Sequence, residues 1–257
     1  MKITHIVFFS GGIASFCAAR RVVDKFGADA VRLLFTDTRI EDNDLYRFLR
    51  EGADLLGAEL VEIADGRTPW EVFRDVRMMG NARVDPCSKI LKRELAKKWV
   101  TDNYPKPEEA RLYIGLDWSE GHRLPAVRSN WEPYAVSAPM MEPPLDTRLE
   151  MFRQVRALGV GVPRLYKLGA SHNNCGGFCI KAGQGQFAWL LRNFPERYKE
   201  HEDKESAFRE WIGKDVTILR DRRGGDNKRL TLKAHRENIE SGMQADLFEI
   251  GGCGCFA

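Results

Sequence analysis

A run of serine and glycine near the start of the chain, Ser10-Gly11-Gly12-Ile13-Ala14-Ser15, stands between an apolar stretch and a helix-like stretch. Glycines at such a junction let the backbone curl so that its N–H groups and the next helix N-terminus face an anion. Ser10 and Ser15 add hydroxyl donors at the two ends of the curl. The run therefore predicts a phosphate-binding loop, and the alternative is a tight strand-to-helix turn without a ligand. Gly-Lys-Ser/Thr and the G-x-G-x-x-G spacing are both absent, so the run is neither a Walker A motif nor a dinucleotide fingerprint.

Cysteines are the second group of residues that could take part in chemistry, and the chain has six of them. In a protein expected in the reducing cytoplasm, they indicate metal ligands or reactive thiols rather than disulfides. Cys17 lies among apolar residues of a predicted helix and is expected in the core. Cys87 opens a basic helix, where the helix dipole and Lys89 favour the thiolate.

The other four cysteines lie on glycine-rich segments. Cys175 and Cys179 enclose two glycines, and Cys253 and Cys255 belong to the tail. Thiolates on such flexible backbone suit zinc or an iron–sulfur cluster, although the spacings do not match a zinc ribbon. The alternative is a set of unrelated reduced thiols.

Histidine and arginine side chains add further candidates. His122 and Arg123 follow the fourth predicted strand, and Arg123 and Arg128 are suited to a bidentate grip on a phosphate or sulfate. His172 is a candidate ligand or proton donor, with polar loop surface as the alternative.

The composition, with 43% apolar and 30% charged residues, is that of a globular protein. The net charge of +3 is too small to indicate nucleic-acid binding by itself, although residues 214–236 are distinctly basic. No stretch reaches the roughly 18 apolar residues of a membrane helix, and no signal-peptide pattern is present. We therefore expect a cytoplasmic protein without a membrane partner, and a homo-oligomer is compatible with the sequence.

Strand-like and helix-like segments alternate through the first half of the chain. The predicted strands span 4–10, 30–38, 58–64 and 110–118, and the predicted helices span 13–27, 41–57, 68–80 and 88–104. Such alternation predicts an α/β fold with a doubly wound parallel sheet and helices on both faces. Because ligands bind outside the carboxyl ends of the strands, residues 10–15, 36–39 and 115–123 are expected to converge.

The second half of the chain no longer alternates between strand-like and helix-like segments. A proline-rich connector at 138–147 precedes predicted helices at 148–159 and 185–213, the second interrupted at Pro195. We expect a nucleotide-binding domain over 1–137 and a mostly helical, cysteine-bearing extension over 138–257.

Four motifs resemble those of a known superfamily. Residues 10–15 are similar to the SGGxxS loop of the PP-loop (ATP pyrophosphatase, or adenine nucleotide alpha-hydrolase) superfamily. "FTDTRIEDNDLYRFL" (35–49), "DPCSKILKREL" (85–95) and "IGLDWSEGHR" (114–123) more narrowly resemble segments of its phosphoadenosine phosphosulfate (PAPS) reductase-like family. The resemblance covers roughly residues 4–130, and more loosely the cysteine-bearing C-terminal part.

The resemblance implies an adenine nucleotide alpha-hydrolase-like, Rossmann-like fold that binds ATP or a PAPS-like nucleotide, with Mg²⁺ accompanying a triphosphate. It implies nucleotide contacts from the 10–15 loop, Phe35, Thr36, Asp37 and Gly115, with a metal or helix-capping role as the alternative for Asp37. Many members carry Lys-Asp where this chain has Ile13-Ala14, so the positive charge near the phosphates is expected from Lys89, Lys92, Arg93 or Arg123.

The resemblance also implies a [4Fe-4S] cluster, with zinc as the second choice. The expected ligands are Cys87, Cys175, Cys179 and Cys255, and a tail cysteine, Cys253 or Cys255, is expected to act in catalysis with Arg123 and Lys89.

Three functions are compatible with these residues. The first is an enzyme that adenylates an acceptor with pyrophosphate release for sulfur transfer, the acceptor being tRNA or DNA bound through 214–236. The second is a sulfonucleotide reductase that uses a cysteine thiolate; the family's terminal Glu-Cys-Gly-x-His is replaced here by "GGCGCF", which favours the first. The third is a non-catalytic nucleotide or cluster sensor.

Overall fold

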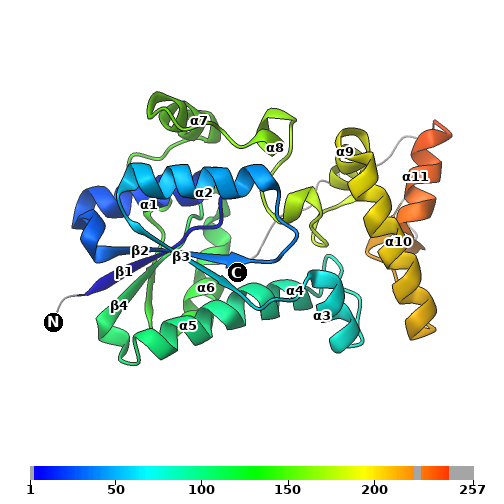
Figure 1. The fold of residues 1–257 in the computed structure, drawn as a ribbon, viewed down its shortest axis with the longest axis horizontal. Coiled ribbons are helices and arrows are strands. Elements are labelled where there is room, and N and C mark those ends of the chain that lie inside the picture. Colours follow the sequence, from blue (N-terminus) through cyan, green and yellow to red (C-terminus); the bar gives the residue numbers. More distant parts are fainter. Residues whose placement is uncertain (1–2, 223–226, 243–257) are drawn as a thin grey trace.

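A parallel sheet of five strands is the centre of the fold (Figure 1). In a computed structural model that describes residues 3–222 and 227–242, its strands run in the order β3-β2-β1-β4-β5. The strands are β1 (Thr4–Phe8), β2 (Val31–Asp37), β3 (Glu59–Ala64), β4 (Ala110–Tyr113) and β5 (Ala135–Ser137). The order reverses between β1 and β4, which places the expected ligand-binding crevice beyond the ends of these two strands.

Helices cover both faces of the sheet. On one face lie α1 (Ile13–Phe26), α2 (Asn43–Leu56) and α7 (Arg148–Ala157), and on the other lie α5 (Leu95–Asn103) and α6 (Leu124–Trp131). Two further helices, α3 (Pro69–Asp75) and α4 (Pro86–Ser88), come between β3 and α5 in the sequence. Alternate residues of β1 divide the core: Val7 packs with α1, α2 and α7, whereas Ile6 and Phe8 pack with α5 and α6. This alternation follows from the two-residue period of a strand and makes the sheet doubly wound, as predicted.

Capping residues fix where the helices that flank the site begin. Asp42 precedes α2, and its carboxylate accepts a hydrogen bond from the Asp44 N–H at 3.0 Å. Thr68 and Glu71 form a capping box at the start of α3, as the sequence predicts from Thr68 and Pro69. Between α4 and α5, residues Lys89–Glu94 form a π-helical segment, and this departure from the predicted single helix over 88–104 turns the Lys92 side chain into the protein interior.

The C-terminal region is mostly helical, as predicted. It contains α8 (Arg164–Lys167), α9 (Gln184–Asn193), α10 (Pro195–Ile212), α11 (Leu232–Glu240) and a hairpin of β6 (Leu219–Asp221) and β7 (Lys228–Leu230). Figure 1 shows α9, α10 and α11 together at one end of the molecule, away from the sheet. These helices share a hydrophobic cluster with Trp70 and Phe73 of α3. By contrast, Met151 and Val155 of α7 belong to the same core as β1 and α1.

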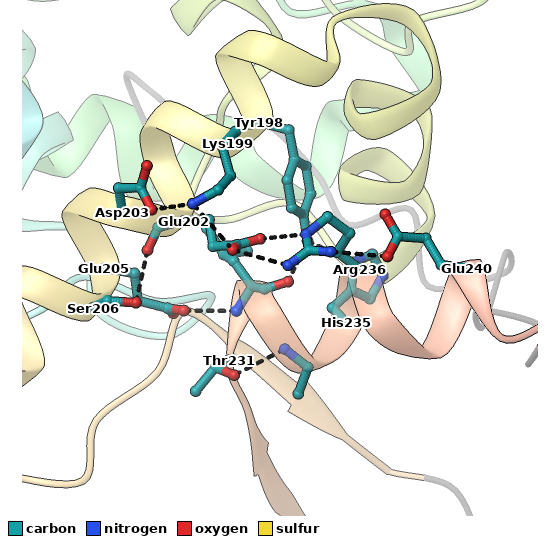
Figure 2. Close-up of polar contacts among 12 residues, drawn as sticks. Tyr198, Lys199, Glu202, Asp203, Glu205, Ser206, Thr231, His235, Arg236 and Glu240 are labelled. Atoms are coloured by element: carbon teal, nitrogen blue, oxygen red, sulfur yellow. Dashed lines mark hydrogen bonds and ion pairs between the residues drawn. The ribbon is translucent and has the colours of Figure 1, made fainter.

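Buried carboxylates of α10 hold the hairpin and α11 in place (Figure 2). Glu205 accepts hydrogen bonds from the backbone N–H groups of Ile218 at 3.1 Å and Leu232 at 2.6 Å. Burial is the main reason that the pKa of Glu205 lies above its ordinary value. Glu202 accepts a hydrogen bond from Arg236 Nε at 2.8 Å, which ties α11 to α10.

Within the described part of the chain, no helix combines the length and apolar character that crossing a bilayer requires.

Candidate functional site

The 10–15 loop links the end of β1 to the start of α1. Gly11 has φ +75°, a conformation that favours glycine, and a Cβ there would lie 2.7 Å from Leu45 Cγ. Ser15 Oγ donates to the Gly12 carbonyl at 2.8 Å, and Ser10 Oγ donates to Ser15 Oγ at 3.3 Å. The first N–H groups of a helix have no carbonyl one turn earlier, so the α1 N-terminus offers the donors that an anion-binding loop requires.

Gly115, which follows β4, lies against this loop. A Cβ at position 115 would lie 2.6 Å from Ser15 Cα and 2.7 Å from Ser15 N. These neighbours are backbone atoms of a helix and cannot move aside as a flexible side chain can. The absence of a side chain at position 115 therefore allows the segment after β4 to pack directly on the first turn of α1.

A cavity of about 330 Å³ opens where these two segments meet. Five of the six loop residues line it, all except Gly11, and so do Gly115 and Arg123. The remaining lining residues are Phe8, Ile114, Leu116, Asp117, Ser119, Glu120, Arg148, Met151, Tyr166, Ser171, His172 and Asn174. The volume lies within the range of small-molecule sites, and the lining combines an apolar wall with convergent polar groups.

Residues from the second half of the chain form part of the wall of this cavity. The Ile13 N–H donates to the Tyr166 hydroxyl of α8 at 3.3 Å. Asn173 is buried, and its Nδ2 donates to the Gly11 carbonyl at 2.8 Å. Tyr166 and Arg148 are site residues that were not predicted from the sequence. The polar run Ser171–Asn174 before Cys175 is the one sequence signal that marks this part of the cavity wall.

Positively and negatively charged side chains both line the cavity. Arg123 forms an ion pair with Glu120 of its own helical turn. Arg148 donates to the Ser171 carbonyl at 2.6 Å, and its guanidinium lies 5.0 Å from the centre of the Tyr166 ring. Asp117 accepts hydrogen bonds from Ser119 and caps the same turn as Glu120. Two arginines and two carboxylates therefore lie at the cavity, and Arg123 and Glu120 are paired with each other.

The residues predicted from the second strand lie elsewhere. Phe35, Thr36 and Asp37 end β2, are buried, and are not among the residues that line the cavity. Asp37 Oδ1 accepts hydrogen bonds from the Arg39 N–H at 2.8 Å and the Tyr46 hydroxyl at 2.9 Å. The α2 cap is Asp42 and not Asp37. A nucleotide role for these three residues stays a prediction.

Buried ion pairs lie just after β2. Lys92 Nζ is 3.5 Å from Glu41 Oε1, and Glu41 also accepts the Cys175 N–H and the Thr38 hydroxyl. Asp42 accepts hydrogen bonds from Arg164 at 2.7 Å and from Arg197 at 3.2 Å. These pairs link the end of β2 to the cysteine loop, α8 and α10.

The pKa of Asp42 reflects two opposing effects. Burial alone would raise it, but the hydrogen bonds from Arg164 and the Asp44 N–H, with the charges of Arg164 and Arg197, hold it below its ordinary value. The carboxylate is therefore ionised and anchored in the folded protein.

Three of the predicted cluster ligands line one cavity. Cys87, Cys175 and Cys179 border a space of about 20 Å³ together with Lys92 and Lys181. Over residues 3–222 and 227–242, no group of three or more histidine, cysteine or acidic side chains has metal-binding geometry, so the described residues do not support the predicted [4Fe-4S] cluster. The fourth predicted ligand, Cys255, and the predicted catalytic residue Cys253 lie outside the described residues.

The remaining predictions have a mixed outcome. Lys89 is mostly exposed, and its Nζ lies 3.6 Å from Glu94 Oε1. It does not line the cavity of about 330 Å³ beside the 10–15 loop, which we call the nucleotide-sized cavity. Arg93 pairs with Asp85 at 3.1 Å, away from that cavity. Cys17 is buried in the core as predicted, and burial raises its pKa to about 12.

Part of the basic stretch 214–236 lines a separate groove. This cavity of about 270 Å³ is bordered by Arg83, Lys181, Arg220 and Arg222, and none of the described residues in its lining is acidic. Ion pairs occur both in this groove and beside it: Lys181 pairs with Asp85 at 3.5 Å, Arg229 with Asp215 and Arg236 with Glu202.

Comparisons with known proteins do not assign this chain to a family. No protein-family model matches the chain, and a search of curated proteins finds no match. One similar solved structure is an NH3-dependent NAD synthetase from Campylobacter jejuni in complex with the nitrate ion. The match covers 84% of this chain and 89% of that one, at 12% identity and a TM-score of 0.42. A likeness this distant says nothing about the reaction, so functional conclusions for this chain rest on its own site.

Proposed function

We propose that this chain is a PP-loop enzyme that binds ATP in the cavity between the 10–15 loop and Gly115, and transfers AMP to an acceptor with release of pyrophosphate. One observation carries the proposal: the serine–glycine loop and the segment after β4 line a single cavity of about 330 Å³. This cavity lies where the strand order reverses, the position at which doubly wound sheets bind nucleotides.

Each part of the cavity has a role in this proposal. The first N–H groups of α1, with Ser10 and Ser15, bind the phosphates, and Arg123 and Arg148 neutralise their charge. Phe8, Ile114 and Met151 provide apolar surface for the base. Magnesium enters with the triphosphate, and Asp117 and Glu120 supply oxygen atoms of the kind that this cation prefers.

The chemical step is a displacement at the α-phosphorus. An oxygen of the acceptor attacks this atom, the bond to the oxygen that bridges to the β-phosphorus breaks, and pyrophosphate leaves with the electron pair. Catalysis by this chain then consists of positioning and of stabilising the negative charge that develops on the phosphates.

Sulfur transfer is the second step of the proposal. Neighbouring residues Asn174 and Cys175 line the nucleotide-sized cavity and the cysteine cavity respectively, so the thiols lie beside the adenylation site. A persulfide on one of these cysteines, loaded by an external sulfur donor, would attack the adenylated carbon with its outer sulfur, and AMP would leave with the electron pair of the C–O bond. A second thiol of the same cavity would then attack the inner sulfur, which breaks the S–S bond, releases the thiolated acceptor and leaves a disulfide for an external thiol to reduce.

A nucleic acid is the acceptor that we propose. The groove lined by Arg83, Lys181, Arg220 and Arg222 supports this choice, since it lacks acidic side chains among its described residues. Lys181 also lines the cysteine cavity, which connects this groove with the thiols. Phosphate contacts of this kind supply most of the affinity in non-specific nucleic-acid binding.

The direct test is a comparison of substrates under anaerobic conditions. Incubation of the full chain with ATP and tRNA or single-stranded DNA should release pyrophosphate and yield an adenylated or sulfur-containing acceptor by mass spectrometry. Arg123→Gln should reduce the rate at least tenfold, whereas Arg153→Gln, on the exposed side of α7, should not. Sulfite formation from PAPS with a thiol, and no pyrophosphate from ATP, would instead establish a sulfonucleotide reductase.

The acceptor is tested separately by fluorescence anisotropy with labelled tRNA. Arg220→Ser should weaken binding and reduce its salt dependence by about one unit of slope. Arg229→Ser is the matched control, because Arg229 lies on the same hairpin but pairs with Asp215 at 3.1 Å. Equal effects of the two variants would exclude the groove.

A further inference from the structure

His172 lies on the loop that closes the nucleotide-sized cavity. It lines this cavity together with Ser10 and Gly12. Its neighbour Asn173 donates to the Gly11 carbonyl at 2.8 Å, so the loop that carries the imidazole is attached directly to the phosphate-binding loop. The position of the ring is therefore fixed relative to the groups that would hold a nucleotide.

Hydrogen bonding defines the tautomer of this histidine. The backbone N–H of Asn174 donates to His172 Nδ1 at 3.4 Å, so Nδ1 acts as an acceptor. A neutral imidazole that accepts at Nδ1 carries its proton on Nε2. Nε2 is buried and has no hydrogen-bond partner within the described part of the chain. A buried N–H without a partner costs free energy, and each such group in a native structure requires an explanation.

Burial and nearby positive charge keep this ring neutral. Burial first, and then the positive charges of Lys92 from the π-helical segment and Arg148 from α7, lower the pKa of His172 to about 4. The side chain is thus a neutral N–H donor at neutral pH. The two cations that disfavour an imidazolium at this position would attract an anionic ligand.

We propose that His172 donates a hydrogen bond from Nε2–H to a phosphate oxygen of the bound nucleotide. This inference rests on the proposed function, since it requires a nucleotide in the same cavity. The alternative is a packing role, in which the ring only fills space beneath the loop. The two differ in what happens when a side chain of similar shape without a donor replaces the imidazole.

The test is ATP affinity, measured by isothermal titration calorimetry on the full chain. His172→Phe should weaken binding about tenfold, because a hydrogen bond to a charged group is lost. His172→Gln, which retains an N–H donor, should recover affinity to within about threefold. The control is His122→Phe, because His122 is exposed, follows β4, and does not line the cavity. It should leave affinity unchanged.

The outcomes separate this inference from the proposed function. ATP binding by the wild type that His172→Phe leaves intact would overturn the role of His172 and retain the nucleotide site. A wild type that does not bind ATP would overturn both.

A second measurement uses the wild type and does not depend on the folding of any variant. Nitrogen-15 NMR of the histidine rings should show a neutral Nε2–H tautomer for His172, and its Nε2 resonance should shift when ATP is added. An Nδ1–H tautomer, or no shift at saturating ATP, would refute the proposal.

Discussion

The side-chain amide of Asn173 donates a hydrogen bond to the Gly11 carbonyl at 2.8 Å, across 162 positions of sequence. Asn173 is 1% exposed, so this bond forms away from water. It joins the loop before Cys175 to the turn after β1. The conformation of the 10–15 loop therefore depends on a residue from the second half of the chain.

Asn173→Asp should disrupt this connection. The variant places a carboxylate against a carbonyl oxygen in a buried position, and we expect a loss of about 3 kcal/mol in the free energy of unfolding, with weaker ATP binding. Urea denaturation and calorimetry measure the two effects. Asn103→Asp is the control, since Asn103 Nδ2 makes a bond of the same 2.8 Å length to the Trp99 carbonyl on the exposed surface. A similar loss in both variants would contradict the structural role of Asn173.

Gly115→Ala should displace the first turn of α1. The added Cβ would lie 2.6 Å from Ser15 Cα, which the helix backbone can relieve only by moving. We expect ATP affinity to fall at least tenfold and the free energy of unfolding to fall by about 1–3 kcal/mol. Gly121→Ala is the matched control, because no atom lies within 4 Å of a Cβ at that position. Lower stability with unchanged ATP affinity would place the nucleotide elsewhere.

Glu205→Gln should loosen the β6–β7 hairpin. One oxygen becomes an NH2 group, which would face the N–H of Ile218 or Leu232 where an acceptor is needed. We expect a loss of about 1–3 kcal/mol in the free energy of unfolding, measured by urea denaturation. Glu200→Gln, on the exposed side of α10, should change stability by less than about 0.5 kcal/mol. The groove that contains Arg220 should lose affinity for nucleic acid only in the first variant.

His201 should make stability depend on pH. Its ring is 4% exposed, accepts from Trp70 Nε1 at 3.0 Å and stacks on Phe178. Burial, with the charges of Lys204 and Arg197, lowers its pKa to about 3. The unfolded histidine takes up a proton near its ordinary pKa, well before the folded one does. The free energy of unfolding should therefore fall as the pH drops from about 6.5 toward 3, by at most about 1.4 kcal/mol per pH unit.

The measurement for His201 is urea denaturation at about pH 7 and about pH 5. The wild type should lose about 2 kcal/mol more than His201→Gln over this interval, because glutamine retains an acceptor for Trp70 but does not titrate. Parallel pH dependences of the two proteins would show that His201 is not the group responsible.

The sequence was sufficient for four of the five strands because each lies in a strand-like segment that alternates with helix-like segments along the first half of the chain. It did not predict β5, since Ala135–Ser137 is too short for an alternating pattern to be recognised. It also extended the fourth strand to Trp118, although β4 ends at Tyr113. There the Asp117 and Glu120 capping box starts a helical turn, and Trp118 is left exposed.

The site could be predicted only where its residues are close together in the sequence. The 10–15 loop could be recognised from consecutive residues, whereas Tyr166 and Arg148 reach the cavity only through packing of α7 and α8 on the other side of α1. Single-sequence patterns contain no signal for such contacts. The division into domains at residues 137 and 138, and the cysteine ligand set that includes Cys255, stay predictions.

The shared core has a practical consequence for dissecting this protein. Met140, Met151 and Val155 pack in one cluster with Val7 and Phe16, so a fragment that stops at residue 137 would leave apolar side chains of α1 uncovered. Such a fragment would also lack Tyr166, which accepts a hydrogen bond from the Ile13 N–H, and Asn173, which donates one to the Gly11 carbonyl. A fragment designed to keep the 10–15 loop folded should therefore extend through at least Cys175. Shorter fragments should aggregate.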